Sequence, residues 1–147
     1  MENQAFLAEV PLFANLSKHH LKGLARACTE RTYKSGAAIV KQGNPGVGLF
    51  IIVSGSVTVE KTTEQGQRIE LATHGPGEVI GEMAVLDGAP RSADVIAQEE
   101  TKVLILASWD FKSFMNTHPE VALAVLPVVV KRFRETNEAL TGTAEHG

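Results

Sequence analysis

Cysteine is almost absent from this chain of 147 residues, in which Cys28 is the only one. No intrachain disulfide or thiol-rich metal cluster can therefore form, and Cys28 is expected to be a small buried residue. A clustered excess of basic residues is also missing, because the formal net charge is −3. This charge argues against a nucleic-acid partner, since nucleic-acid-binding surfaces usually carry a basic patch.

Long hydrophobic runs are missing as well. The longest apolar stretch covers ten residues, 121–130, and contains Pro127, whereas a helix that spans a bilayer needs about 20. The N-terminus, Met1-Glu2-Asn3-Gln4, lacks the basic region and the apolar run of a secretory signal. We therefore expect a cytoplasmic protein without a membrane partner.

Motifs of catalysis are not found either. The chain has no Gly-x-Ser-x-Gly elbow and no phosphate-binding loop of the Gly-x-x-x-x-Gly-Lys-Ser/Thr type. Residues 75–81 resemble a dinucleotide fingerprint only superficially, because the glycine spacing is wrong and Pro76 lies within it. We expect neither an enzyme nor a metal site, since the histidines are scattered without metal-ligand spacing. They are His19, His20, His74, His118 and His146.

The chain is long enough for one domain with its own core. Residues 2–27 carry apolar residues at helical spacing, and Ser17 can cap the second of two helical segments. From Thr32 onward, short β-branched or alternating runs are separated by turns rich in glycine and proline. Many short strands at this spacing predict a mainly β sandwich or jelly roll. The expected strands are 38–40, 49–53, 56–59, 69–73, 93–97 and 103–106.

Helices are expected again after the strands. Ser108 can cap a short helix to Met115, and residues 117–120 combine capping-box spacing with Pro119 in the first turn of a long helix. That helix carries a heptad-like series, which could pair two copies or simply pack onto the β core. The series is Leu126, Val129, Phe133, Thr136 and Leu140. Residues 141–147 form a polar tail.

The most informative stretch is residues 81–93, which read Gly-Glu-Met-Ala-Val-Leu-Asp-Gly-Ala-Pro-Arg-Ser-Ala. A short helix that starts near Glu82 would point free N–H groups at an anion, and Arg91 can make a bidentate contact with a phosphate. Glu82 can then accept a sugar hydroxyl. Alternatively, Arg91 pairs with Asp87 or Asp94, and Glu82 is only a favourable carboxylate at a helix N-terminus. The first reading predicts a ligand with a phosphate and a sugar.

These residues resemble the phosphate-binding cassette of the cyclic-nucleotide-binding domain. That family includes bacterial catabolite activator proteins, regulatory subunits of cyclic-AMP-dependent kinase and cyclic-nucleotide-gated channels. The matching cassette positions are Gly81-Glu82, Ala84, Leu86, Pro90-Arg91-Ser92-Ala93 and Val95, and the resemblance extends to Pro11-Leu12-Phe13, 43–59 and 131–137.

The resemblance implies a mainly β fold with flanking helices, a double-stranded β-helix or jelly-roll barrel. A domain of residues 1–140 is implied, with N-terminal helices in 1–31 and a β-roll in 32–107. The cassette, with its short phosphate-binding helix, occupies 81–93, and the C-terminal helices occupy 108–140.

The resemblance also implies roles for individual residues of the cassette, which includes Met83 and Ala84. Gly81 and Ala93 offer backbone N–H groups to the phosphate, and Arg91 pairs with its charge. Glu82 takes the ribose 2′-hydroxyl, and Ser92 donates to the phosphate or the base.

Other implied contacts come from outside the cassette. Val59 and Leu71 provide an apolar wall for the base. Arg132 and Thr136 on the last helix reach the base, and Asn137 contacts the ligand bound to a partner subunit. The chain departs from the family pattern at His74, where an apolar residue is common, and at Pro127, which interrupts the long helix.

The implied function is a regulatory sensor of a cyclic nucleotide, cyclic AMP or else cyclic GMP, with no cofactor and no catalysis. Binding would move the C-terminal helix, provided that the ligand binds one arrangement better than another. A homodimer through that helix is expected. Only seven residues follow Leu140, so we expect no DNA-binding domain in this chain and an unidentified downstream partner. The rival interpretation is a scaffold that keeps the fold without responding to nucleotide, and hydrolysis of the cyclic phosphate comes third.

Overall fold

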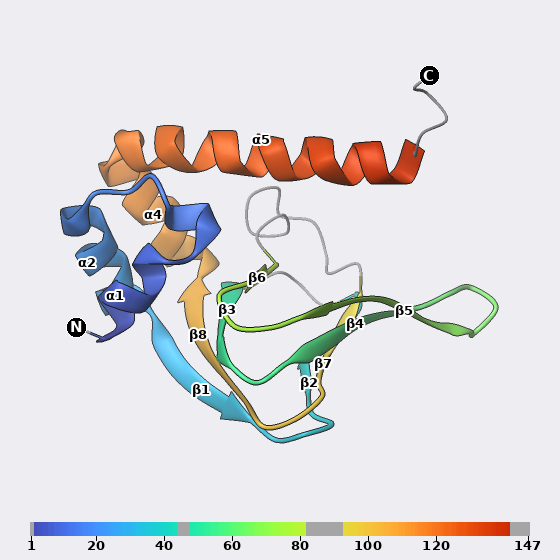
Figure 1. Cartoon of the computed structure of the whole chain (residues 1–147). Coiled ribbons are helices and arrows are strands. Elements are labelled where there is room, and N and C mark those ends of the chain that lie inside the picture. The colour runs from blue at the N-terminus through green and yellow to red at the C-terminus, as the bar shows by residue number, and fades with distance from the viewer. Residues whose placement is uncertain (1, 44–47, 82–92, 142–147) are drawn as a thin grey trace.

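Helices surround one end of the strands. The computed structural model describes residues 2–43, 48–81 and 93–141, with backbone alone for Glu2 and 136–141. In Figure 1 the N-terminal helices and α4 gather beside the strands, and α5 runs across them. The helices are α1 (Glu2–Ala8), the 3-10 turn η1 (Pro11–Phe13), α2 (Lys18–Ala27), α4 (Ser108–Thr117) and α5 (Pro119–Thr141).

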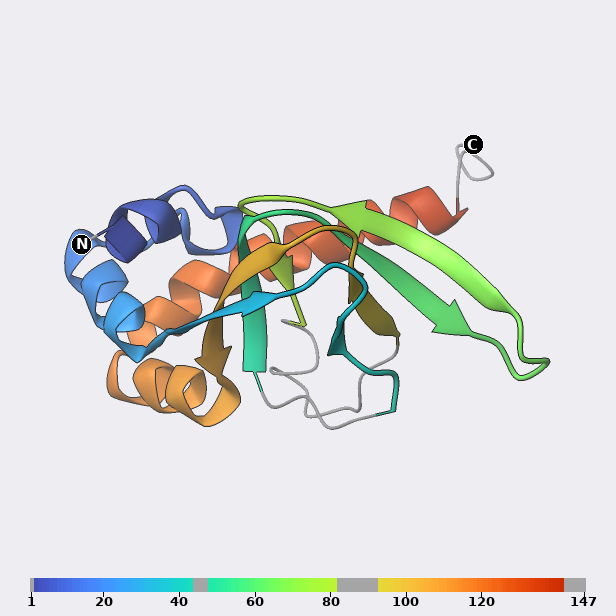
Figure 2. The ribbon, with the colours of Figure 1, turned by 90° about the horizontal axis from the view of Figure 1, so that it is seen from below.

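The strands of the described ranges form two antiparallel four-stranded sheets. The β4–β5 hairpin projects from the body as an arm (Figures 1 and 2). One sheet has the order β1 (Thr29–Tyr33), β8 (Thr101–Ala107), β3 (Gly48–Ser54), β6 (Val79–Ile80). The other has the order β2 (Ala38–Val40), β7 (Asp94–Ala97), β4 (Val57–Thr62), β5 (Arg68–His74).

The expected jelly-roll architecture is confirmed, but the expectation of a closed barrel is wrong. In the described ranges the two sheets do not close on each other. Their edge strands β1 and β5 are mostly solvent-exposed and carry charged side chains, which is how proteins usually protect open sheet edges.

β3 is buried on both faces, because successive side chains of a strand point in opposite directions. Leu49 and Ile51 belong to a cluster that β3 shares with the helices. Phe50 and Ile52 belong to a second cluster, which lies between the two sheets. This double burial explains why the sequence of β3 is a nearly continuous apolar run.

The first part of α5 is anchored in the helical cluster. Val121 and Val125 are 0% and 2% exposed, and Val128 and Val129 are partly buried against the same cluster. Pro127 therefore lies inside a continuous helix instead of interrupting it, since packing on both sides of the proline offsets its missing hydrogen bond. Of the expected heptad-like series, Leu126 and Phe133 are exposed, whereas Val129 is partly buried against the helical cluster.

The ends of the helices confirm some of the expected caps. Ser17 caps α2 and accepts a hydrogen bond from the His20 N–H at 3.2 Å, and Pro119 begins α5. Ser108 is instead the first residue of α4, where Ala107 takes the cap position without a side-chain hydrogen bond. Thr117 likewise belongs to α4. Among the described residues, no single helix is long and apolar enough to cross a membrane, and only the α4–α5 pair, bent by 119°, reaches that length and composition together.

Two strands were not predicted from the sequence. β1 is exposed at four of its five positions, so it shows no apolar alternation, and it exists because it pairs with β8. The β region consequently begins at Thr29 and not at Thr32. β6 contains only two residues and is defined by its pairing with β3.

Cys28 lies half-buried against the helical cluster. Burial, together with the nearby Asp110 carboxylate, raises the pKa of its thiol to about 11. Cys28 is therefore a packing residue with little thiolate at neutral pH.

Gly55, in the turn between β3 and β4, gives a test of the packing. Its φ is +93°, and an added Cβ would lie 2.5 Å from the Glu100 carbonyl oxygen and 2.7 Å from the Thr101 Cα. Gly55→Ala should therefore combine backbone strain of about 1–2 kcal/mol with overpacking of about 1–3 kcal/mol. Gly66 is the control, since its φ is +83° but no atom lies within 4 Å of an added Cβ. Urea denaturation should show a clearly larger loss of unfolding free energy for Gly55→Ala, and equal losses would contradict the described turn.

Candidate ligand-binding site

The two ends of segment 82–92 are held in different sheets. Gly81 follows β6, which pairs with β3, and its φ of +88° lies in the region that favours glycine. Ala93 is 8% exposed and precedes β7, which pairs with β2 and β4. Five predicted site residues fall outside the described residues: Glu82, Met83, Ala84, Arg91 and Ser92.

A polar network fixes the chain directly after Ala93. The Gln42 backbone N–H donates to Asp94 Oδ1 at 2.6 Å, and Arg68 donates to Asp94 Oδ2 at 2.8 Å and to Glu60 Oε1 at 2.6 Å. The Gln42 side chain is itself held by the Thr62 backbone, through hydrogen bonds of 3.0 and 3.3 Å. These contacts tie the start of β7 to β4, β5 and the segment after β2.

The network also sets the charge of Asp94. The hydrogen bond from the Gln42 backbone, and next the Arg68 guanidinium, lower the pKa of the Asp94 carboxyl below its usual 3.8. The Asp94 side chain is only 19% exposed, while that of Arg68 is 46% exposed. The sequence indicates Asp94 only as an alternative partner for Arg91, because the network depends on strand register that no local pattern reveals.

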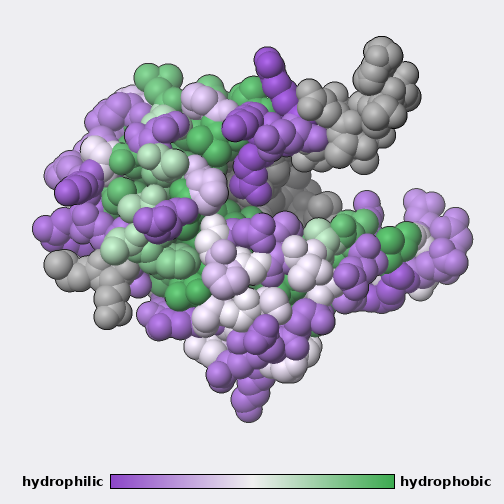
Figure 3. All heavy atoms as spheres, in the orientation of Figure 1, coloured by the Kyte–Doolittle hydropathy of each residue, from purple (hydrophilic) through white to green (hydrophobic). Residues whose placement is uncertain are grey.

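The two predicted wall residues lie in different surroundings. Val59 pairs with Val95 of β7 and Ala72 of β5, and it packs half-buried against the cluster between the sheets. Leu71 is the extra residue of a β-bulge, since Val59 pairs with Ala72 while Glu60 pairs with Glu70. Leu71 is 55% exposed. Figure 3 shows apolar atoms along the arm on the side that faces α5.

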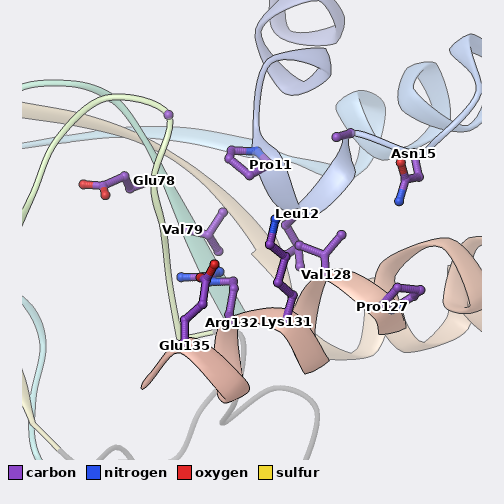
Figure 4. A pocket seen from close by; sticks show the side chains of 12 residues that line it. Pro11, Leu12, Asn15, Glu78, Val79, Pro127, Val128, Lys131, Arg132 and Glu135 are labelled. Carbon is purple, nitrogen blue, oxygen red and sulfur yellow. The ribbon is translucent and has the colours of Figure 1, made fainter. Parts of the chain in front are cut away.

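Of the predicted residues of the last helix, Arg132 lies close to β6. Arg132 is half-buried and lines a cavity of about 550 Å³ between η1, the turn before β6, and α5 (Figure 4). Val79 and Glu78 line the same cavity, so α5 runs close to the strand that leads into Gly81. Thr136 and Asn137 follow on the α5 backbone, and their side chains lie outside the described residues.

His74, where the chain departs from the family pattern, faces the turn before β6. Its Nδ1 lies 3.2 Å from Glu78 Oε1, but without the geometry of a hydrogen bond. The same carboxylate oxygen accepts the Gly75 N–H at 2.7 Å.

Three of the histidines that are scattered in the sequence lie close together in the fold. The ring centroids of His20 and His118 lie 5.0 Å apart, and those of His19 and His118 lie 6.4 Å apart. The fold brings these rings together where α2 meets the junction of α4 and α5. No spacing rule detects such a cluster, because His118 follows His20 by 98 positions in the sequence.

A comparison with known families identifies the chain. The family model of the cyclic nucleotide-binding domain matches residues 30–118. The chain belongs to this family. The resemblance inferred from the cassette is thereby confirmed, and with it a regulatory, ligand-binding class of domain.

The relatives of this cyclic nucleotide-binding domain include a channel and a receptor protein. It is 39% identical over 122 residues to a cyclic nucleotide-gated potassium channel from Mesorhizobium japonicum, covering 83% of this chain and 32% of the channel. It is 35% identical over 127 residues to the cyclic AMP receptor protein of Thermus thermophilus, covering 86% and 59%. The chain thus spans about one third to three fifths of these curated relatives.

A solved structure supports the same assignment. The N-terminal domain of a transcriptional regulator from Streptomyces coelicolor A3(2) superposes with a TM-score of 0.79 and 36% identity, covering 91% of this chain and 96% of that one. The fold seen here is therefore that of a domain which also occurs within a transcriptional regulator.

Acid should weaken the network around Asp94. Because the folded-state pKa is lowered, the interactions of Asp94 stabilise the fold above its usual pKa of 3.8 and are lost as the pH falls through the folded value. Asp94→Asn should be less stable than the native chain at pH 7, and it should lose less stability between about pH 5 and pH 3. Urea denaturation at several pH values measures this, with exposed Glu64→Gln as the control. Parallel pH profiles for Asp94→Asn and the native chain would show that Asp94 does not contribute.

Proposed function

We propose that this domain is a sensor that binds cyclic AMP at segment 82–92 and transmits binding through α5. The observation that carries the proposal is the placement of the two residues that flank this segment: Gly81 follows β6 of one sheet, and Ala93 precedes β7 of the other. Fixed flanking residues would help to preorganise backbone N–H groups for a phosphate.

The roles proposed for the cassette follow the family resemblance. Gly81 and Ala93 provide N–H groups, Arg91 binds the cyclic phosphate, Glu82 binds the ribose 2′-hydroxyl, and Ser92 binds the phosphate or the base. Cyclic AMP is favoured over cyclic GMP because one relative is a cyclic AMP receptor protein.

The geometry around Asp94 supports a ligand role for Arg91. Pairing with Asp94 was one alternative for this arginine. Both Asp94 oxygens already accept hydrogen bonds, from Gln42 and from Arg68. An additional surface ion pair with Arg91 would contribute little, since exposed pairs are worth about 0–1 kcal/mol.

The position of α5 supports the coupling. Its first part is packed into the helical cluster through Val121 and Val125, whereas Arg132 lies beside β6 and Phe133 is 60% exposed. A ligand that contacts the distal part, where Thr136 and Asn137 lie, can shift this helix without unfolding its base. The ligand would be bound without turnover, in a cytoplasmic protein.

An exposed apolar stripe on α5 supports a homodimer. Its residues recur at intervals of three, four and three positions, which is the spacing of a heptad seam. They are Leu123, Leu126, Val130 and Phe133, with exposed fractions of 71%, 57%, 41% and 60%. We propose that this stripe, in place of the series through Val129, packs against the same stripe of a second copy.

Removing Arg91 should weaken cyclic AMP binding strongly. Truncating one partner of a desolvated charge pair costs roughly 2–5 kcal/mol, so Arg91→Ala should bind about 30-fold more weakly or worse, with the fold intact. Isothermal titration calorimetry measures this, and Arg26→Ala, at an exposed position on α2, should bind like the native chain. If cyclic AMP and cyclic GMP neither bind to nor thermally stabilise the native chain, the domain is instead a scaffold without a nucleotide response.

A carboxylate in the exposed stripe should separate the two copies. Phe133→Asp would bury a charge in an apolar contact, which costs several kcal/mol. Analytical ultracentrifugation should then find a monomer for Phe133→Asp and a dimer for the native chain. Arg134→Asp, at the neighbouring exposed position outside the stripe, should stay dimeric. A native chain that is monomeric at high concentration, with and without nucleotide, would refute this arrangement.

A further inference from the structure

A compact group of polar side chains lies where α2 meets the start of α5. His20 comes from the first turn of α2, His118 from the residue between α4 and α5, and Glu120 from the first turn of α5. Phe114 packs against both histidine rings, with centroid distances of 6.0 Å to His20 and 4.9 Å to His118. The rings are therefore held on one side by the hydrophobic helix packing.

The atoms that face one another are metal-ligand atoms. His20 Nε2 lies 3.1 Å from Glu120 Oε2, and His118 Nδ1 lies 4.0 Å from the same oxygen. One ligand atom from each residue lies within 4.8 Å of the other two. Bonds of about 2.0–2.2 Å in a tetrahedral zinc site place ligand atoms roughly 3.4 Å apart. Small side-chain rotations would therefore bring all three atoms onto one ion.

Ser17 favours the orientation that such a site needs. Its Oγ lies 3.1 Å from His20 Nδ1 and also accepts the His20 backbone N–H at 3.2 Å. When Oγ accepts the Nδ1 proton, the Nε2 atom that faces Glu120 is the one available to an ion. Metal-bound histidines are commonly oriented by such a hydrogen bond at the other ring nitrogen.

The backbone at His118 is also fixed. Its N–H donates to the Phe114 carbonyl at 2.8 Å, and its carbonyl accepts the Val121 N–H at 2.8 Å. Pro119 follows and restricts the chain further. His118 and Glu120 are two positions apart in the sequence, and the tight junction between α4 and α5 thus holds both of them in place.

A simpler account is a hydrogen bond from a His20 Nε2–H to Glu120. That bond explains the 3.1 Å distance, but it does not explain why His118 Nδ1 also faces the same carboxylate oxygen. A cation would account for the positions of all three groups. It would take the place of the proton between His20 and Glu120, and it would also bind His118 Nδ1.

We propose that His20, His118 and Glu120 form a binding site for a divalent transition metal of the zinc class. Two imidazoles and one carboxylate suit Zn²⁺, Co²⁺ or Ni²⁺ better than Mg²⁺ or Ca²⁺, which prefer oxygen ligands. The side chains of His20, His118 and Glu120 are 13%, 33% and 62% exposed, so an ion can enter from solvent and keep a water as its fourth ligand. The bound ion would join α2 directly to the start of α5.

The test uses the full chain after chelator treatment. Titration with ZnCl₂ in a calorimeter should show one saturable site per chain, and Co²⁺ should give the visible absorption of tetrahedral coordination. His118→Ala and Glu120→Gln should each weaken zinc binding at least 10-fold. Glu120→Gln keeps the side-chain shape, and circular dichroism checks that each variant is folded.

His74→Ala is the matched control, because His74 lies beside Glu78 in a pair that contains no third ligand among the described residues. This variant should bind zinc like the native chain. Zinc should also raise the melting temperature of the native chain and of His74→Ala, but not that of the two site variants. Equal zinc affinity in the native chain, His118→Ala and Glu120→Gln, or weak binding without saturation, would overturn the proposal.

Discussion

The burial of β3 and β8 on both faces is the constraint on which the rest of the structure depends. Leu49, Ile51, Leu104 and Leu106 point to the helices, while Phe50, Ile52 and Val103 point to the other sheet. The helices and the second sheet are thus held on opposite sides of a single layer. A one-residue shift in the register of β3 would exchange the two sets of side chains between the clusters and disrupt the packing of both, so the relative placement of helices and sheets is strongly specified.

This layer also places the proposed nucleotide site. β6 joins it beside β3, and β7 belongs to the other sheet, so segment 82–92 begins on one layer and ends on the other. The hydrogen bonds of Asp94 to Gln42 and Arg68 hold the second end. The polar network of Asp94 therefore fixes the start of β7, directly after Ala93.

α5 has two regions with different surroundings. Val121 and Val125 bury the first turns against the helical cluster, and beyond them most side chains up to Glu135 are exposed or half-buried. The proposed metal ligands lie where α2 meets the start of α5, whereas Arg132, Thr136 and Asn137 lie toward the distal end of α5. A metal ion would hold the base of the helix, and a nucleotide would act on its other end, so the two proposed ligands need not compete for one surface.

The sequence by itself determined the family, the jelly-roll class, the N-terminal and C-terminal helices and most of the strands. Those features follow from local patterns: helical spacing in residues 2–27, glycine-bounded apolar runs such as β3, and the residues of segment 81–93. Only the tertiary structure decided that β1 exists, that Val129 is partly buried while Leu123 and Val130 are exposed, and that His20 lies close to His118. It also revealed the network that joins Asp94 to Arg68 and Gln42. The physical reason is that each of these features depends on strand register or on packing between residues distant in the chain. Neither can be inferred from the pattern of neighbouring residues in the sequence.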